Sequence, residues 1–130
     1  MSSPPPELNT AGALIRFAAS LESETADRYA EWAAAPEAPD SYQELATEHA
    51  LRVERLTRLL REQLNEMILE PISGLCTADY LGPGADVTDL ERRLARLYTD
   101  LIARAGHILP GASRTLARFA ERSLQLASQQ

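Results

Sequence analysis

Lysine is absent from this sequence, and all 13 basic residues are arginines. Without lysine the chain can neither form a Schiff base with a carbonyl substrate nor build the phosphate loop of P-loop proteins, whose lysine contacts the phosphates. Cysteine is almost absent, because Cys76 stands alone. A single cysteine excludes an internal disulfide and a cysteine-based metal cluster, so we expect Cys76 to be an inert thiol in a reducing compartment.

Long apolar runs are missing as well. No run approaches the roughly 20 residues that span a bilayer, and the first residues, Met-Ser-Ser-Pro-Pro-Pro-Glu, lack the basic and apolar parts of a secretion signal. We therefore expect a cytoplasmic protein with no membrane partner.

The net charge is −6, with nine acids and two arginines in residues 1–50 and ten acids and eleven arginines in residues 51–130. This acidic balance argues against nucleic-acid binding.

The sequence does contain long segments rich in alanine, leucine, glutamate and arginine, which are typical of helices. The longest regular pattern covers residues 41–69 and ends before Pro71, which prevents the helix from continuing. Three more periodic stretches predict helices at 10–35, 87–109 and 112–128. The apolar stripe of the 41–69 helix consists of Tyr42, Leu45, Ala46, Val53, Leu56, Leu59, Leu60, Leu64, Met67 and Ile68.

The connections between these helices predict how they are arranged. Residues 36–40, Pro-Glu-Ala-Pro-Asp, form a short stiff turn that makes the first two helices antiparallel. The connection from Pro71 to Asp86, about fifteen residues, is long enough to run the length of a bundle. The predicted fold is all-α: an antiparallel four-helix bundle of two helical hairpins joined by a long crossover. It occupies residues 10–130, after a disordered or extended leader over residues 1–9.

Two polar residues interrupt the apolar face of the second helix. His49 and Arg52 project from the same side as Leu45 and Leu56, where apolar residues are expected. A buried histidine or arginine needs hydrogen-bonding or charged partners, because an unpaired charge in a core costs several kcal/mol. The other helices must therefore supply those partners.

The first and third helices carry the same short pattern. Glu22 follows a leucine and precedes Tyr29 by seven residues, and Glu91 follows a leucine and precedes Tyr98 by seven residues. Both glutamates fall on or beside the inner face of their helix. The two halves of the chain therefore share one plan, which predicts two similar helical hairpins.

The paired Glu-x6-Tyr elements, with a crossover between them, resemble the ferritin-like superfamily and, within it, the rubrerythrin-type proteins, over residues 10–128. In that family the first and third helices each supply an inward glutamate. The second and fourth each supply Glu-x-x-His, and together the helices hold two metal ions. The resemblance implies iron or another divalent metal, with Glu22, His49 and Glu91 as the residues that would contact it.

The chain departs from that family because it contains no Glu-x-x-His motif. In the register Leu-Ala-Thr-Glu-His-Ala-Leu-Arg from residue 45, His49 stands at the glutamate position and Arg52 at the histidine position. In the fourth helix the ligand positions hold Ala120 and Ser123.

A guanidinium cannot bind a metal ion and adds a fixed positive charge. We therefore expect Arg52 to lie between Glu22 and Glu91 in place of a metal, with His49 adding a hydrogen bond. A metal held by the two glutamates and His49 is the competing interpretation.

Three functions remain open. The first is a ferritin-like bundle without its dimetal centre or another cofactor, acting as a structural or interaction module of unknown role. The second is a rubrerythrin-like oxidoreductase or metal-handling protein with a depleted site. The third is a helical regulator whose acidic first hairpin docks a basic protein partner. We expect a homodimer, because the apolar stripe of the 41–69 helix outruns its partners near Leu60, Leu64, Met67 and Ile68. No catalytic residue is assigned.

Overall fold

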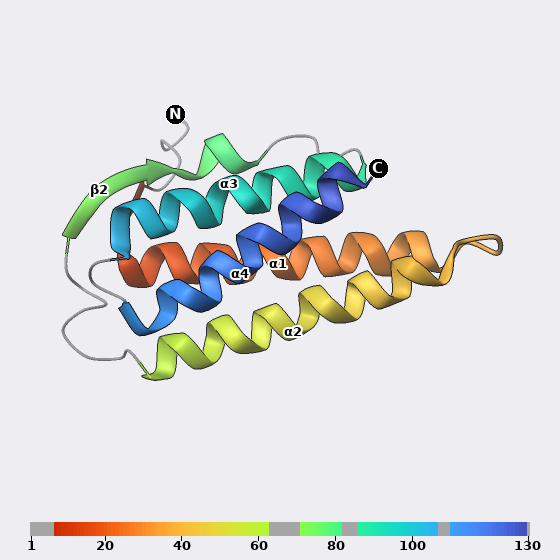
Figure 1. Cartoon of the computed structure of the whole chain (residues 1–130), viewed down its shortest axis with the longest axis horizontal. Helices are drawn as coiled ribbons and strands as arrows, with labels where there is room; N and C mark the ends of the chain where they lie inside the picture. The colour runs from red at the N-terminus through yellow and green to blue at the C-terminus, as the bar shows by residue number, and fades with distance from the viewer. Residues whose placement is uncertain (1–6, 63–70, 82–85, 107–109, 130) are drawn as a thin grey trace, which may run out of the picture.

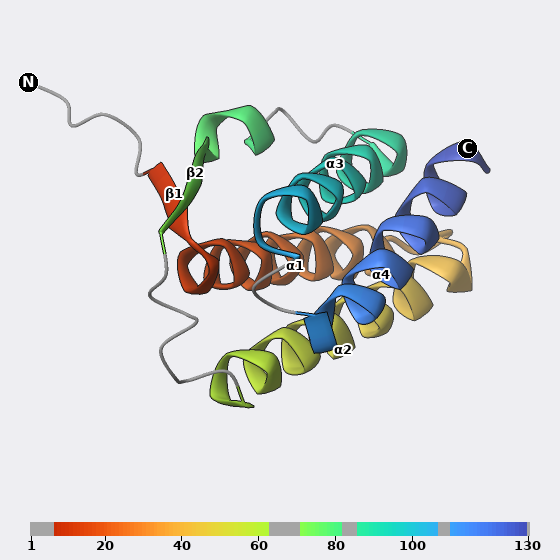
Figure 2. The same cartoon turned by 60° about the vertical axis from the view of Figure 1, so that its left-hand side comes forward.

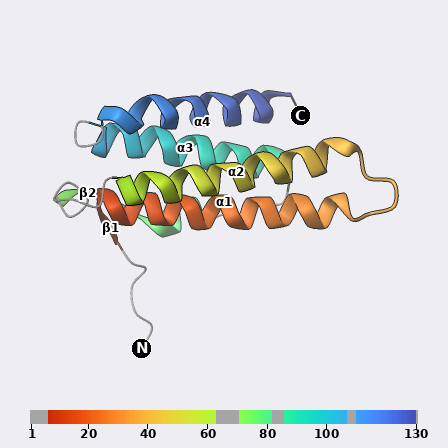
Figure 3. The same cartoon turned by 90° about the horizontal axis from the view of Figure 1, so that it is seen from below.

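A computed structural model of the chain describes residues 7–62, 71–81, 86–106 and 110–129. Helices make up most of this part and lie alongside one another (Figures 1 and 3), which confirms the prediction of an all-α bundle. None of these helices is long and apolar enough to cross a membrane. The helices are α1 (Ala11–Ala33), α2 (Asp40–Glu62), α3 (Val87–Ala105) and α4 (Pro110–Ser128).

The first two helices begin and end where local chemistry dictates. Thr10 caps α1, because its hydroxyl accepts a hydrogen bond from the Ala13 backbone N–H at 3.0 Å. Such a cap is worth about 1 kcal/mol. Residues 34–39 then turn the chain back, and α2 packs along α1 (Figure 1). The α2 helix begins at Asp40, one residue earlier than predicted.

The other two helices form a second packed pair. Asp86 caps α3 by accepting a hydrogen bond from the Asp89 backbone N–H at 2.9 Å. The α4 helix packs along α3, and α3 also contacts α1. The helix predicted to start at residue 112 starts at Pro110. The ends predicted for two helices, at residues 69 and 109, lie outside the described residues. The same is true of His107, the second histidine of the chain.

A short β-ribbon, which the sequence does not predict, joins the leader to the crossover. Strand β1 (Glu7–Thr10) pairs antiparallel with β2 (Pro71–Cys76), and the two lie side by side near the start of α1 (Figure 2). Residues 7–9, which the sequence assigns to a disordered or extended leader, are therefore part of a strand. A 3₁₀ turn, η2 (Thr77–Tyr80), follows, and the buried Tyr80 donates a hydrogen bond to Asp100 on α3 at 2.5 Å. As predicted, the crossover packs on the bundle.

The core consists of two apolar clusters, separated along every helix by a polar residue. The larger cluster includes Leu14, Ile15, Ala18, Leu21, Leu56, Leu59, Leu94, Leu97, Leu101, Ala112 and Leu116. The smaller one consists of Tyr29, Leu45, Ala46, Val87, Leu90 and Leu126. The residues between them in sequence are Glu22 on α1, His49 and Arg52 on α2, Glu91 on α3 and Ser123 on α4. This arrangement brings polar side chains from all four helices to one level of the core.

Candidate functional site

Seven polar side chains form a buried network at that level, which we call the polar cluster. Each is at most 4% exposed, so water cannot satisfy their charges and hydrogen bonds, and they must satisfy one another. The polar cluster consists of Glu22 and Tyr29 from α1, His49 and Arg52 from α2, Glu91 and Tyr98 from α3, and Ser123 from α4.

His49 bridges the two glutamates. Its Nδ1 contacts Oε1 of Glu22, and its Nε2 lies 2.7 Å from Oε2 of Glu91. Because carboxylates only accept hydrogen bonds, both ring nitrogens can donate only if the imidazole is protonated. Burial lowers the pKa of His49, but its hydrogen bonds to Glu22 and Glu91 outweigh burial and raise the pKa to about 9. His49 is therefore an imidazolium at neutral pH.

Arg52 is the second cation of the polar cluster. Its Nη1 donates to Oε2 of Glu22 at 3.1 Å and to Oγ of Ser123 at 2.8 Å. Its guanidinium carbon also lies 5.2 Å from the centroid of the Phe119 ring, a favourable cation–π distance. Burial lowers the pKa of Arg52, but the charges of Glu22 and Glu91, the neighbouring Tyr98 and the hydrogen bond to Glu22 together outweigh burial and raise that pKa, so the side chain stays charged.

Each of the two tyrosines donates a hydrogen bond to the glutamate of the other helix. Tyr29 on α1 donates to Oε2 of Glu91 on α3 at 2.6 Å, and Tyr98 on α3 donates to Oε2 of Glu22 on α1. Burial and the neighbouring carboxylates raise the pKa of both phenols well above the ordinary value. Both tyrosines therefore remain protonated hydrogen-bond donors.

The charges of the polar cluster cancel. Glu22 and Glu91 supply two negative charges, and Arg52 and protonated His49 supply two positive ones. Burial raises the pKa of Glu91, but the hydrogen bond and charge of His49 outweigh it and lower that pKa. Ser123 contributes to the lowering, although its hydroxyl lies outside hydrogen-bond geometry to Oε1 of Glu91. A balanced set of charges joined by hydrogen bonds is how a core tolerates four charges, and here only Nη2 of Arg52 and Oε1 of Glu91 in the polar cluster have no hydrogen-bond partner among the described residues.

The structure brings together every residue predicted for the site, but His49 and Arg52 differ from their predicted roles. Arg52 lies within hydrogen-bonding distance of Glu22, as predicted. The prediction that Arg52 lies between Glu22 and Glu91 is wrong, because His49 occupies that position. An imidazole has a nitrogen on each side of its ring and can join two carboxylates, whereas the guanidinium of Arg52 is directed to Glu22 and to Ser123 on α4.

The partners of the tyrosines and of Ser123 do not follow from the sequence. The seven-residue spacing predicts tyrosine hydroxyls that reach polar groups, but not that each reaches the glutamate of the other helix. Ser123 stands at a position where the resembled family has a metal ligand. That alignment was the one sequence signal that pointed to Ser123. It indicated a lost metal ligand and did not predict that Ser123 accepts a hydrogen bond from Arg52.

These residues, as arranged, do not fit a dimetal centre. Both nitrogens of His49 face carboxylate oxygens, and Arg52 brings a fixed positive charge to 3.1 Å from Glu22. Over residues 7–62, 71–81, 86–106 and 110–129, no three histidine, cysteine, aspartate or glutamate side chains form a group that could hold a metal ion. Two cations, His49 and Arg52, lie beside the glutamates instead.

Comparisons with protein-family models, with curated proteins and with solved structures give no match to this chain. The fold and the polar cluster define the class of protein, which is a helical bundle with a buried, charge-neutral polar centre.

Proposed function

We propose that this chain is an antiparallel four-helix bundle of ferritin-like type in which two side-chain cations stand in place of a dimetal centre. Support comes from the placement of the glutamates on α1 and α3 and of the cations on α2, the helix that carries a Glu-x-x-His motif in the resembled family. The turn at 34–39 and the crossover between α2 and α3 agree with two helical hairpins (Figure 1).

On this proposal the protein is a structural or interaction module. The observation that carries it is the charge balance: Glu22 and Glu91 already have His49 and Arg52 as counter-charges. A divalent ion would have to displace the imidazolium and would lie beside a guanidinium, which Coulomb repulsion opposes. The polar cluster then fixes the alignment of four helices, a role that buried ionic groups serve in some proteins.

The module acts through self-association, as a homodimer. Leu51 on α2 and Leu124 on α4 are 58% and 55% exposed, and contact with a second copy would remove their apolar surface from water. Of the residues on which the sequence-based argument for a dimer depends, Leu64, Met67 and Ile68 lie outside the described part of the chain. Light scattering at micromolar concentration tests the dimer, and a monomeric mass contradicts it.

Elemental analysis tests the loss of the metal centre. The native protein, purified from cells supplied with iron, manganese and zinc, is expected to contain far less than one metal ion per chain. The double variant His49→Glu with Arg52→His rebuilds the Glu-x-x-His spacing of α2 and is expected to gain metal. Stoichiometric metal in the native protein, with none gained by the variant, contradicts the proposal.

The second candidate is a rubrerythrin-like oxidoreductase or metal-handling protein. One observation favours it: Glu22 and Glu91 both reach a single group, His49, and each accepts a tyrosine hydroxyl. It requires Arg52 to move away so that the glutamates and His49 can share an iron or another divalent ion. Anaerobic addition of ferrous iron, followed by gel filtration and iron analysis, distinguishes it from the first candidate.

A further inference from the structure

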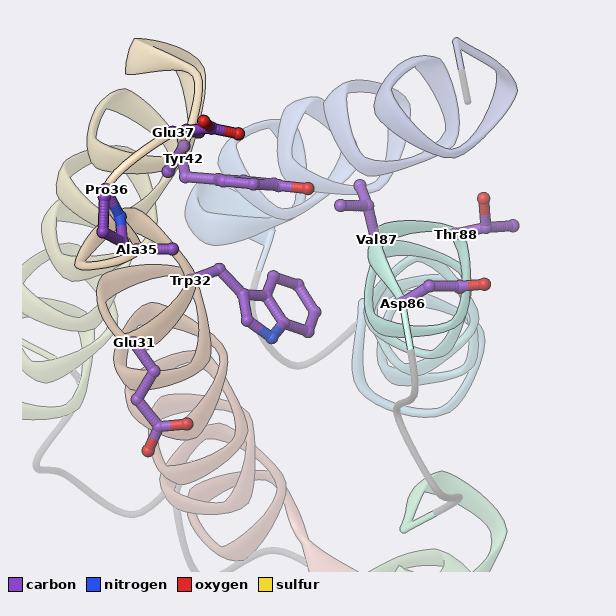
Figure 4. Close-up of a pocket in the computed structure, with 10 residues that line it drawn as sticks. Glu31, Trp32, Ala35, Pro36, Glu37, Tyr42, Asp86, Val87 and Thr88 are labelled. Atoms are coloured by element: carbon purple, nitrogen blue, oxygen red, sulfur yellow. The ribbon is translucent and has the colours of Figure 1, made fainter.

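A pocket of about 960 Å³ lies at the end of the bundle, and no residue of the polar cluster lines it. It opens between the turn that joins α1 to α2 and the start of α3 (Figure 4). The rings of Trp32 and Tyr42 project into it, toward Val87 on α3. The rim carries the carboxylates of Glu31, Glu37 and Asp86, and no arginine is among the described residues that line it.

The two aromatic rings are held in place by a third, buried ring. The Tyr29 centroid lies 5.6 Å from that of Trp32 in an edge-on arrangement and 6.3 Å from that of Tyr42 in a stacked one. Trp32 and Tyr42 are 5.7 Å apart. Both are partly exposed, so their outer surfaces face the pocket. Because the rings are packed before any ligand arrives, binding would cost little ordering of side chains.

The negative charge of the pocket is not compensated by nearby arginines. Some surface acids are paired, as Glu48 is with Arg122 at 3.0 Å. Glu31 and Glu37 are exposed and form no ion pair with any residue that the structure describes. Asp86 uses one carboxylate oxygen to cap α3, which offsets the positive end of that helix. Glu31 and Glu37 therefore give the pocket a negative potential.

We propose that this pocket binds a small organic cation, a substituted ammonium with an apolar part. Aromatic faces attract such cations through their quadrupole, and nearby carboxylates add Coulomb attraction. A bare divalent metal ion fits less well, because no three carboxylates or imidazoles in the described residues could hold one. The volume lies within the usual range for small-molecule sites. This inference goes beyond the proposed function and requires of the polar cluster only that the Tyr29 ring stays in place.

The chain's one tryptophan, Trp32, reports on the pocket directly. Choline is titrated while tryptophan fluorescence is recorded, and calorimetry provides a second measurement. The matched control ligand is 3,3-dimethylbutan-1-ol, which has the shape of choline with carbon in place of the charged nitrogen. We expect saturable binding of choline, at least roughly tenfold tighter than the neutral alcohol and weakened by salt. Equal binding of the two, or no saturable change with choline, overturns the proposal.

Variants locate the binding in this pocket. The double variant Glu31→Gln with Glu37→Gln is expected to weaken choline binding several-fold and to reduce its salt dependence, because the Coulomb attraction is removed. Tyr42→Leu is expected to weaken choline binding while Trp32 still reports. Glu54→Gln is the control, because it neutralises an exposed acid of α2 that lies outside the pocket. Circular dichroism confirms that each variant is folded. Native-like choline binding by the double variant overturns the proposal.

Discussion

The two helix pairs, α1–α2 and α3–α4, contribute to the polar cluster similarly through their first helices and differently through their second helices. The α1 and α3 helices each supply a glutamate and a tyrosine, and each tyrosine donates to the glutamate of the other helix. The α2 and α4 helices are unlike. The former supplies both cations, and the latter supplies a single hydroxyl, that of Ser123. The α1 and α3 helices therefore bring the negative charges into the core, and α2 alone supplies the positive charges that balance them.

This comparison has an energetic consequence. The anions and their tyrosines come from two helices, so the loss of one tyrosine leaves both carboxylates with other donors. Both positive charges come from α2, within one turn of helix, so the loss of one leaves a buried negative charge without its counter-charge. We therefore expect substitutions on α2 to destabilise the protein more than equivalent substitutions on α1, α3 or α4.

The largest effect is expected for Arg52→Ala. Removing this guanidinium leaves Glu22 with one counter-charge fewer in a site closed to water, at a cost of roughly 3–5 kcal/mol in the free energy of unfolding. Urea denaturation followed by circular dichroism measures it. The matched control is Arg55→Ala, an exposed arginine on the same helix, with an expected change within about 0.5 kcal/mol. A loss at Arg52 as small as that at Arg55 would show that the charge balance of the core does not matter.

The next effect is a loss of stability at high pH, caused by His49. Its pKa is about 9 in the folded protein, above the ordinary histidine value of 6.5. The extra stability is therefore fully present below about pH 6.5 and is lost as the pH rises through about 9. The change is about 3 kcal/mol in the free energy of unfolding. In the folded protein Tyr29 and Tyr98 stay protonated across this window because their pKa values are raised, and Arg52 stays charged. In the unfolded chain tyrosines ionise near their ordinary pKa of about 10, which adds to the loss only at the upper end of the window.

Urea denaturation at a series of pH values from 6 to 10 measures this effect, with ~1 pH unit between points. His49→Gln is the control, because an amide keeps hydrogen-bonding groups but cannot titrate. It is expected to be less stable than the native protein at pH 6 and to show a flatter profile. A native profile that is as flat as that of the variant would contradict a protonated His49.

A smaller and symmetric effect is expected for the tyrosines. Tyr29→Phe and Tyr98→Phe each remove one hydrogen bond to a carboxylate and leave the ring in place. Each is expected to cost about 2 kcal/mol, since hydrogen bonds to charged groups contribute more than neutral ones. The two variants are compared by thermal unfolding at one pH. Very unequal losses would show that the exchange of partners between α1 and α3 is not energetically symmetric.

The smallest effect is expected for Ser123→Ala. Its hydroxyl accepts one hydrogen bond from Arg52, which keeps its ion pair with Glu22 when that bond is lost. The expected loss is about 1 kcal/mol. In a double-mutant cycle with Arg52→Ala, the Ser123 substitution is expected to add little, because its partner is already gone. Fully additive losses would place the contribution of Ser123 elsewhere.

Sequence reasoning reached the helices and the inward residues because both follow from local periodicity. The spacing that predicts an amphipathic helix also places Glu22, His49, Arg52 and Glu91 on inner faces, and all four are buried. It could not decide which cation lies between the glutamates. That choice depends on how far side chains reach across helices, and periodicity along one helix carries no such information.

Two other features depend on residues far apart in the chain. The β1–β2 ribbon pairs residues 7–10 with residues 71–76, and no hairpin turn joins them to mark the pairing in the sequence. The pocket joins acids and aromatic residues from the end of α1, the following turn and the start of α2 to the start of α3. Each depends on the packed fold, so neither has a local signal in the sequence.

The central claim is that protonated His49, together with Arg52, neutralises two buried glutamates in place of a metal. Nitrogen-15 NMR of histidine-labelled protein at pH 7 tests it most directly, with His107→Gln used to assign the signals of the chain's two histidines. We predict that both ring nitrogens of His49 are protonated, with two hydrogen-bonded N–H protons, and that a chelator does not change the spectrum. A neutral imidazole, or a signal that the chelator shifts, would contradict the account.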